Sequence, residues 1–422
     1  MSHLTNKVKL LSVLSLALLF SIAGCDSELT TNSDSSSHEG LSAVQSDQQV
    51  SQLKRISDKT NERAEELLAF ARKKGYDLEA ANEKLADLTS QTADNQVYQN
   101  IVKRAINGDD YECEPTPLNE WASENLVYAN LGDALVIILL GIDQYPFLYS
   151  LVFENERNPR QSYGYDGEYT RQIFRADRGI SRFWDVNLRE VQTVSAHGSM
   201  LADFDKVFDI VEVLYPNDTE ESNADFAQLI VDLVTGEPLY NNGDVPLFSF
   251  NAVAYGGGAY TVNGEDGPPN VIMGDGILAG MDAIGLGDAA PEAILAHEMG
   301  HQVQYALDVF ENDPITDPAE STRRTELMAD AFSAYYLGHK RGAAFNWDRV
   351  ETFMQADYNV GDCSFDSPGH HGTPNQRMKA AEFGFDLAEQ APRRMGIMSG
   401  SDFVDAFDNE LPDIVAPDAE GN

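Results

Sequence analysis

Residues 296–304 read AHEMGHQVQ, so His297 and His301 lie four positions apart and Glu298 directly follows the first histidine. Residues i and i+4 share one face of an α-helix, so a helix here would bring both imidazoles to one metal ion. Glu298 would then lie near enough to take a proton from a water molecule beside that ion. This spacing constrains the chain strongly, because it predicts a helix at the centre of a metal-dependent hydrolytic site.

The residues around this motif independently predict a helix. Asp288 can cap its N-terminus, and Pro291 falls in the first turn, where proline is well tolerated. Apolar side chains recur at helical spacing, at Ile294, Leu295, Met299, Val303 and Leu307. The motif therefore lies where local signals already favour a helix.

Two histidines are too few for a catalytic zinc site, which usually has three protein ligands and one position for water. The third histidine of the metzincin pattern would fall at position 307, which is a leucine. Glu326 and Asp330 also lie four positions apart, in a second predicted helix that is capped near Ser321 and runs to about Gly338. We expect Glu326 to be the third ligand and Asp330 to orient a ligand imidazole, with a solvated surface acid as the alternative for each.

A third element begins at two adjacent histidines. Thr373 and Gln376 form a capping box with Pro374 at the first helical position, so His371 is expected just before a well-fixed helix N-terminus. There it can donate a hydrogen bond to a developing oxyanion, or act as a removable metal ligand. The neighbouring His370 leaves the assignment open, as does a purely structural role.

The order of three motifs, AHEMGHQVQ, TELMADAFSAYY and HGTPNQRMKAAEFGFDLA, resembles the bacterial neutral zinc metallopeptidase family, a gluzincin-like group with two histidines and a glutamate on zinc. The resemblance is good over roughly residues 245–390, weak over 116–244 and absent from the N-terminal helical part. It implies a zincin fold, in which a small twisted sheet packs against the active-site helix and an edge strand pairs with the substrate backbone. Asn270–Ile277 or Ser249–Tyr255 would supply that strand.

The motifs together imply one catalytic Zn²⁺ ion and a peptide or protein substrate. The metal ligands would be His297, His301 and Glu326. Glu298 would act as the general base that takes a proton from water and passes it to the leaving amine.

The remaining histidines and two tyrosines receive weaker assignments. His371 is the favoured oxyanion donor, and Tyr335 or Tyr336 is a less favoured one. His197 and His339 have no comparable context, so we expect both to be structural.

Composition and periodicity divide the chain into a signal peptide (1–24), a flexible linker (25–48), a helical N-terminal segment (49–115), a zinc metallopeptidase domain (116–400) and an acidic C-terminal tail (401–422). Within the domain, Phe183–Ala196, Pro246–Tyr260 and Asn270–Ile277 are predicted strands, and Asp203–Leu214 is a predicted helix. The apolar run Ala134–Ile142 is too short to span a bilayer and is expected in the core. The predicted fold class is therefore α+β.

The first residues have the pattern of a secretory signal. Lys7 and Lys9 precede an apolar run, Leu10–Ile22, and the sequence IAGC ends at Cys25. That tetrapeptide resembles the bacterial lipobox, which implies cleavage before Cys25, its acylation, and a protein anchored in the cell envelope at its periplasmic or outer face. An ordinary signal peptide with an incidental cysteine is the alternative.

The remaining cysteines are Cys113 and Cys363. In an oxidising compartment, pairing the two is the simplest arrangement, and two unpaired buried thiols are the alternative.

The charge balance limits the class of partner. The chain has 29 Lys and Arg against 69 Asp and Glu, a formal net charge of −40, which disfavours nucleic acid. Hydrophobic residues make up 42%, as in an ordinary folded protein, so the surplus acids are expected on a folded surface.

The leading functional prediction is a membrane-anchored zinc metallopeptidase. One alternative is a lipid-anchored, zinc-containing binding or assembly protein without turnover, and another is a hydrolase of a non-peptide amide. Glu298 favours an enzyme, because a non-catalytic site needs no general base.

Overall fold

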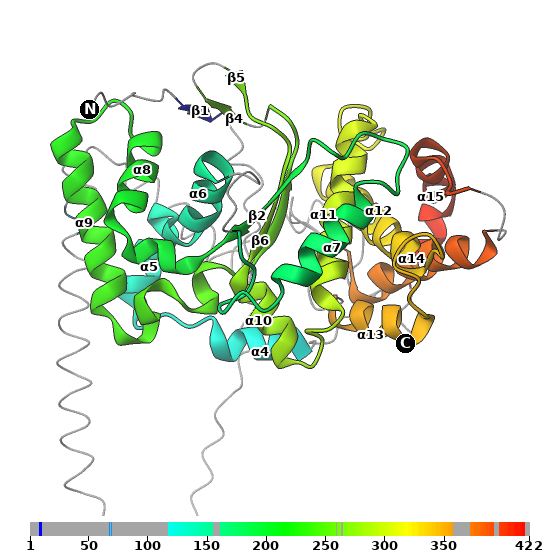
Figure 1. Cartoon of the computed structure of the whole chain (residues 1–422), viewed down its shortest axis with the longest axis horizontal. Coiled ribbons are helices and arrows are strands. Elements are labelled where there is room, and N and C mark those ends of the chain that lie inside the picture. The colour runs from blue at the N-terminus through cyan, green and yellow to red at the C-terminus, as the bar shows by residue number, and fades with distance from the viewer. Residues whose placement is uncertain are drawn as a thin grey trace, which may run out of the picture.

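A computed structural model describes residues 8–10, 67, 69, 117–154, 161–258, 260–262, 265–357, 372–391 and 396–417. It is a mixed α+β fold, mostly helical (Figure 1). The strands are β1 (Val8–Leu10), β2 (Gln192–Ala196), β3 (Ala252–Tyr255), β4 (Tyr260–Val262), β5 (Glu265–Asp266) and β6 (Asn270–Gly274). The helices before the metal-motif region are α4 (Pro117–Asn125), α5 (Leu131–Leu140), α6 (Tyr145–Phe153), α7 (Thr170–Ile180), α8 (Phe204–Leu214) and α9 (Glu220–Gly236). The later ones are α10 (Asp275–Ala283), α11 (Ala290–Ala306), α12 (Pro318–Gly338), α13 (Trp347–Asp357), α14 (Pro374–Gln390) and α15 (Gly400–Ile414). Short 3₁₀ helices occupy Ile142–Gln144, Gly198–Ala202, Pro238–Gly243 and Pro246–Phe248.

The central sheet has three strands in the order β2-β6-β3. β2 pairs with β6 in parallel, with Gln192 opposite Asn270, and β3 pairs with β6 antiparallel, with Tyr255 opposite the same Asn270. All five residues of β6 are buried, as expected of a central strand covered on both faces. A second, smaller sheet has the order β1-β4-β5.

Helices cover both faces of the central sheet (Figure 1). Val194, Ala196 and Ile272 pack with residues of α6 on one face, and beyond them α5, α8 and α9 build a separate apolar cluster. Val271 and Met273, which alternate with Ile272 along β6, face the larger cluster formed with α7 and α10 to α15. The histidine motif thus lies on a helix of the larger cluster, against the sheet.

Several predicted elements agree with the structure. The helix predicted at 203–214 is α8, and the apolar run at 134–142 forms α5 and the turn after it, with Val136, Ile137 and Ile142 buried. The motif lies on α11, and α12 ends at Gly338 as predicted.

Other predicted boundaries are wrong. Of the strand predicted at 183–196, only the last five residues pair as β2, because Phe183 and Trp184 are instead buried against aromatic side chains of α12. The strand predicted at 246–260 shortens to β3, and the one predicted at 270–277 changes to helix at 275.

Both predicted N-caps of the motif helices also differ. α11 begins after Ala289 without a side-chain cap, so Asp288 is not its N-cap. α12 begins one turn before Ser321, where Asp317 accepts hydrogen bonds from the backbone of Ala319 and Glu320.

The prediction of an acidic tail at residues 401–422 is corrected by the structure. Residues 400–414 form helix α15, and its Phe403 and Phe407 are completely buried in the larger apolar cluster. Arg324 of α12 also donates two hydrogen bonds to Asp408, each 2.8 Å long. Residues 401–417 therefore belong to the domain.

Most of the N-terminal predictions lie outside the described residues. These are the linker, the lipidated Cys25, the Cys113–Cys363 pair, the signal peptide apart from β1, and the helical segment apart from Leu67 and Ala69. Leu67 is helical and buried in the cluster with α8 and α9. No helix in the described part of the chain is both long enough and apolar enough to cross a bilayer.

Candidate metal centre

Helices α11 and α12 cross closely at the histidine motif. Gly300 permits this approach, because a Cβ atom there would lie 3.2 Å from the Cα and carbonyl oxygen of Ala329. His297 and His301 therefore face Glu326 of α12 across a short gap. The two imidazole rings have centroids 4.9 Å apart.

These three side chains form a group that could hold a metal ion. Nε2 of His297 lies 3.4 Å from one carboxylate oxygen of Glu326, and Nε2 of His301 lies 3.4 Å from the other. All three ligand atoms lie within 4.8 Å of one another, and each residue is at least largely buried. The structure thus brings together the three residues that the sequence predicts as ligands.

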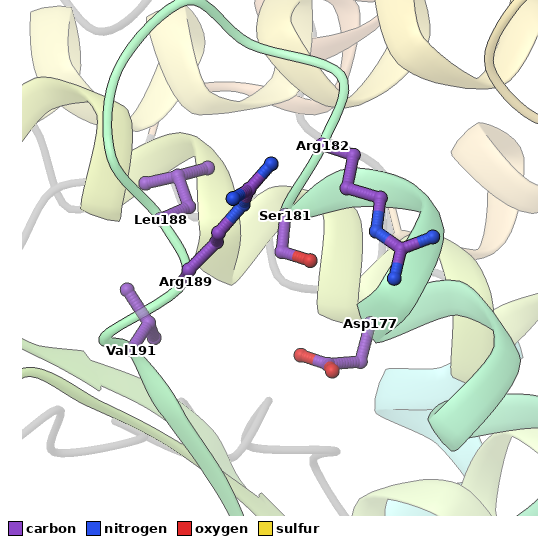
Figure 2. Close-up of a pocket in the computed structure, with 6 residues that line it drawn as sticks. All are labelled: Asp177, Ser181, Arg182, Leu188, Arg189 and Val191. Atoms are coloured by element: carbon purple, nitrogen blue, oxygen red, sulfur yellow. The ribbon is translucent and has the colours of Figure 1, made fainter.

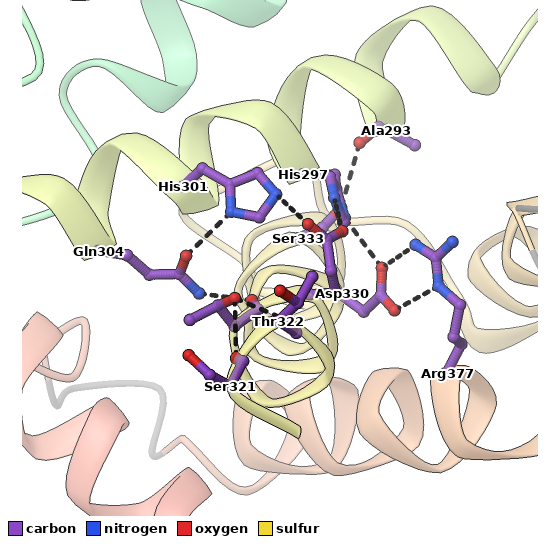
Figure 3. A network of polar contacts seen from close by, with 11 residues as sticks. Ala293, His297, His301, Gln304, Ser321, Thr322, Asp330, Ser333 and Arg377 are labelled. Atoms are coloured by element: carbon purple, nitrogen blue, oxygen red, sulfur yellow. Dashed lines mark hydrogen bonds and ion pairs between the residues drawn. The ribbon is translucent and has the colours of Figure 1, made fainter. Parts of the chain in front are cut away.

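A buried ion pair holds the first imidazole from behind (Figure 3). Nδ1 of His297 lies 2.9 Å from Oδ1 of Asp330. Arg377 of α14 donates to both oxygens of that carboxylate, at 2.7 Å from Nε and 2.6 Å from Nη2. Because a carboxylate accepts, Nδ1 of His297 carries a proton, which leaves Nε2 as the ring atom that faces Glu326 and could bind a metal.

The second imidazole is held by an amide. Oε1 of Gln304 accepts from Nδ1 of His301 at 2.9 Å, while its Nε2 donates to the carbonyl oxygen of Thr325 at 2.6 Å (Figure 3). The bond to Thr325 fixes which end of the completely buried amide faces the histidine. Nε2 of His301 is therefore also left free for a metal.

The charges in this group favour a cation. Burial lowers the pKa of His297, but hydrogen bonds and charges from Asp330 and Glu326 outweigh burial and raise it well above its ordinary value. The pKa of His301 is likewise raised, because the charge and hydrogen bond of Glu326 outweigh its burial. A metal ion that binds here must displace a proton, so we expect metal affinity to decrease as the pH is lowered.

Two phenols lie near enough to Glu298, which is only 7% exposed, to be affected by its charge. Burial, and then the charge of Glu298, raise the pKa of Tyr255 to about 12 and that of Tyr305 to about 12. Both tyrosines therefore keep their proton at neutral pH and can donate a hydrogen bond.

Gln302 links the motif helix to the sheet. Its Nε2 donates to the carbonyl oxygen of Tyr255 at 3.1 Å and to that of Asn270 at 2.9 Å. These two acceptors face each other across β3 and β6. Of the two segments predicted as the edge strand, β3 lies at the edge and β6 lies in the centre.

The predicted oxyanion donors have different outcomes. His371 and His370 lie outside the described residues, although the capping box of Thr373 and Gln376 that follows them is confirmed. The hydroxyl of Tyr335 accepts from the backbone N–H of Met398, and that of Tyr336 lies 3.4 Å from Glu292. Both tyrosines are buried in the aromatic core with Phe183, so neither is an oxyanion donor.

Sequence reasoning missed four residues around the ligands. They are Tyr255, Gln304, Tyr305 and Arg377. A helical signal was present for two of them, because Gln304 and Tyr305 follow His301 by three and four positions and so share its face. No local pattern joins Arg377 to Asp330, which lies 47 positions earlier in the chain.

A second polar cluster lies at the carboxyl ends of β2 and β6. Nδ1 of His197 lies 2.5 Å from Asp275, and its Nε2 lies 2.9 Å from Oγ of Ser195. The same Oγ lies 2.8 Å from Oε1 of Gln161, which also accepts from the Ser195 backbone. The Ser195 hydroxyl has one hydrogen for its two contacts. Because the amide oxygen of Gln161 can only accept, Oγ donates to Gln161, and Nε2 of His197 donates to Oγ. His197 is then an imidazolium, whereas a nucleophilic triad needs the serine to donate to a neutral imidazole.

This cluster predicts a pH-dependent contribution to stability. Burial lowers the pKa of His197, but the hydrogen bond and charge of Asp275 raise it overall, with Lys206 opposing and Glu154 assisting. A raised pKa stabilises the fold below the ordinary histidine value of ~6.5, and the gain is lost as pH rises through the folded-state pKa. We expect the Tm difference between wild type and His197→Gln to be largest at pH ~5.5 and to shrink towards pH ~9.

Thermal unfolding across this pH range measures the effect. His339→Gln is the matched control, because the pKa of His339 is lowered by burial and nearby cations. Its Tm difference from wild type should not shrink as pH rises. A difference for His197→Gln that stays constant over the whole range would contradict the imidazolium.

Comparison with models of protein families, with curated proteins and with solved structures found no match.

Proposed function

We propose that this protein is a zinc-dependent metallopeptidase with a zincin-like fold, related to the bacterial neutral zinc metallopeptidases. The observation that carries the proposal is the joint placement of His297, His301 and Glu326 with Glu298 beside them in one buried group. Two imidazoles and a carboxylate are a common donor set of catalytic zinc sites. The sequence patterns of residues 1–25 support a lipid-anchored protein of the cell envelope.

The spacing of the donor atoms is compatible with one small divalent ion such as zinc. Four ligands at ~2.1 Å from a tetrahedral centre are separated by ~3.4 Å along each edge. Each histidine Nε2 lies 3.4 Å from a different oxygen of Glu326, and with one ligand atom per residue the three atoms lie within 4.8 Å of one another. A small shift of these side chains would therefore be enough to form zinc bonds.

The proposed chemistry follows from the position of each side chain. When bound, zinc supplies a Lewis acid that polarises a carbonyl group and makes water more acidic. Glu298 takes the proton from the attacking water and later gives it to the leaving amine. Tyr255 and Tyr305, which remain protonated beside Glu298, are available as hydrogen-bond donors to the oxyanion, as is His371.

The substrate is proposed to lie along β3. This strand is the edge of the sheet, and Gln302 ties its last residue to the motif helix. A peptide that adds to β3 as a further strand would pass the metal ligands with its backbone held by hydrogen bonds.

The test of this function combines metal content with cleavage of a peptide library. Protein purified without added metal should contain one zinc per chain, cleave peptides, lose cleavage on chelation and regain it with added zinc. Stoichiometric zinc with no cleavage of any peptide would favour the alternative, a zinc-containing binding or assembly protein.

Loss of the proposed third ligand should be visible in metal binding. Glu326→Ala removes one of three ligands, so zinc affinity should fall by more than the ~10–100-fold that a lost outer-shell partner costs. Glu389→Ala, an exposed acid at the end of α14, is the matched control and should bind zinc normally. Competition with a chromogenic chelator gives both affinities, and equal values for the two variants would exclude Glu326 as a ligand.

A further inference from the structure

Basic side chains are distributed very unevenly along the chain. Arginines occupy positions 171, 175, 178, 182 and 189, whereas Lys206 is the only lysine or arginine between positions 190 and 322. The first three lie on α7, whose inner face is buried through Ile173, Ala176 and Ile180. In a chain of net charge −40, this local excess of cations needs an explanation.

A hollow of about 400 Å³ lies at the C-terminal end of α7. Its lining residues are Asp177, Ser181, Arg182, Leu188, Arg189 and Val191. Figure 2 shows that Asp177, Ser181 and Arg182 lie on the last turn of α7 and just after it. The other three residues come from the segment that leads into β2. The hollow is thus walled by two chain segments.

The two arginines in this hollow are not neutralised by any described residue. Within the described residues, neither Arg182 nor Arg189 forms an ion pair with a carboxylate, and both are exposed. In a protein with a large surplus of acids, two guanidinium groups beside one hollow thus have no carboxylate partner in the part of the chain that the structure describes. Guanidinium groups bind carboxylates well, often through two parallel hydrogen bonds.

The third charged group in the hollow has the opposite sign. Oδ1 of Asp177 accepts a hydrogen bond from Thr193 at 2.9 Å. Burial raises the pKa of Asp177, and the hydrogen bond from Thr193 and the charge of Arg178 only partly oppose that rise. A cation bound in the hollow would therefore relieve the cost of keeping this carboxylate charged.

We propose that this hollow binds a free α-amino acid. Arg182 and Arg189 would take its carboxylate, and Asp177 would take its ammonium group. Leu188 and Val191 line the hollow but are only 2% and 4% exposed, so recognition would rest on the three charged groups. A simple anion such as phosphate fits less well, because Asp177 would repel it.

The size of the hollow agrees with this ligand. A sphere of 400 Å³ is about 9 Å across, and small-ligand pockets begin at about 300 Å³. The two charged ends of an amino acid, each with a hydrogen bond of ~2.9 Å to the protein, span a similar distance. The proposal does not depend on the metal group, which uses other residues.

Isothermal titration calorimetry on the full chain tests the site. L-leucine, L-alanine and L-methionine are the probes, and at least one should bind with a Kd of ~1 mM or lower. The N-acetyl and amide derivatives of the best probe lack one charge each, so each should bind at least ~10-fold more weakly.

Variants distinguish this hollow from any other site. Arg182→Gln with Arg189→Gln, and separately Asp177→Asn, should weaken the best probe at least ~10-fold. Arg171→Gln lies on the same helix outside this hollow and should bind like wild type. The proposal is overturned if none of the three amino acids binds at 10 mM, if the N-acetyl derivative or inorganic phosphate binds as tightly as the amino acid, or if the double variant binds normally.

Discussion

Glu298→Gln is expected to lower kcat/KM for peptide cleavage by about 10²–10⁴-fold and to leave zinc content unchanged. Glutamine has nearly the same shape as glutamate but cannot accept the water proton. The three ligand residues are separate from Glu298, so the metal group itself should be intact. Metal analysis together with steady-state kinetics on one peptide substrate measures both effects.

Glu292→Gln is the matched control for this change. Glu292 is also a glutamate on α11, so the substitution is the same. Its carboxylate lies 3.4 Å from the Tyr336 hydroxyl and away from the metal group. It should keep wild-type turnover. If Glu298→Gln kept turnover too, Glu298 would not be the general base, and a variant that lost zinc as well would show a ligand or folding defect instead.

Arg377→Met is expected to destabilise the fold by about 3–5 kcal/mol, because it leaves the carboxylate of Asp330 buried without its cation. Asp330 is 0% exposed and Arg377 is 2% exposed, so water cannot replace the lost partner. Zinc affinity should fall as well, by ~10–100-fold, since Asp330 holds the imidazole of His297. Urea unfolding of the zinc-free protein and zinc competition measure the two effects separately.

A double-mutant cycle gives this prediction its control. Asp330→Asn keeps an oxygen that can accept from His297 but removes the charge, so combining it with Arg377→Met removes both buried charges. The double variant should be more stable than the sum of the single losses predicts, by at least ~2 kcal/mol. Additive losses would mean that Arg377 and Asp330 stabilise the fold independently of each other.

The sequence predicted the parts of the site that depend on helical spacing. His297 with His301, and Glu326 with Asp330, each lie four positions apart, and the structure places both pairs on helices with their side chains converging. The fold class follows similarly from periodic patterns. Helices α11 and α12 approach each other closely at Gly300, and no local sequence pattern predicts this contact.

Two of the errors share one cause, which is tertiary contact. The acidic composition of residues 401–422 predicted a solvated tail, yet two phenylalanines spaced four apart, Phe403 and Phe407, bury α15 in the core. Phe183 and Trp184 looked like strand residues, but they pack against aromatic rings of α12. In both cases the same apolar side chains are compatible with several local structures, and packing decides among them.

If a peptide adds to β3 as proposed, the amide of Gln302 would influence which of its bonds is cut. Both hydrogens of one side chain are used, one on the last residue of β3 and one on its partner in β6. The depth of the edge strand relative to His297 and His301 is therefore set by a single amide, that of the residue directly after His301. A peptide laid along β3 could change which residue faces the metal only by sliding in steps of two, because alternate residues of a strand point the same way. The cleavage position would then depend on the register of the peptide on β3. A change in the length of the substrate's paired segment would move the cut by two positions at a time.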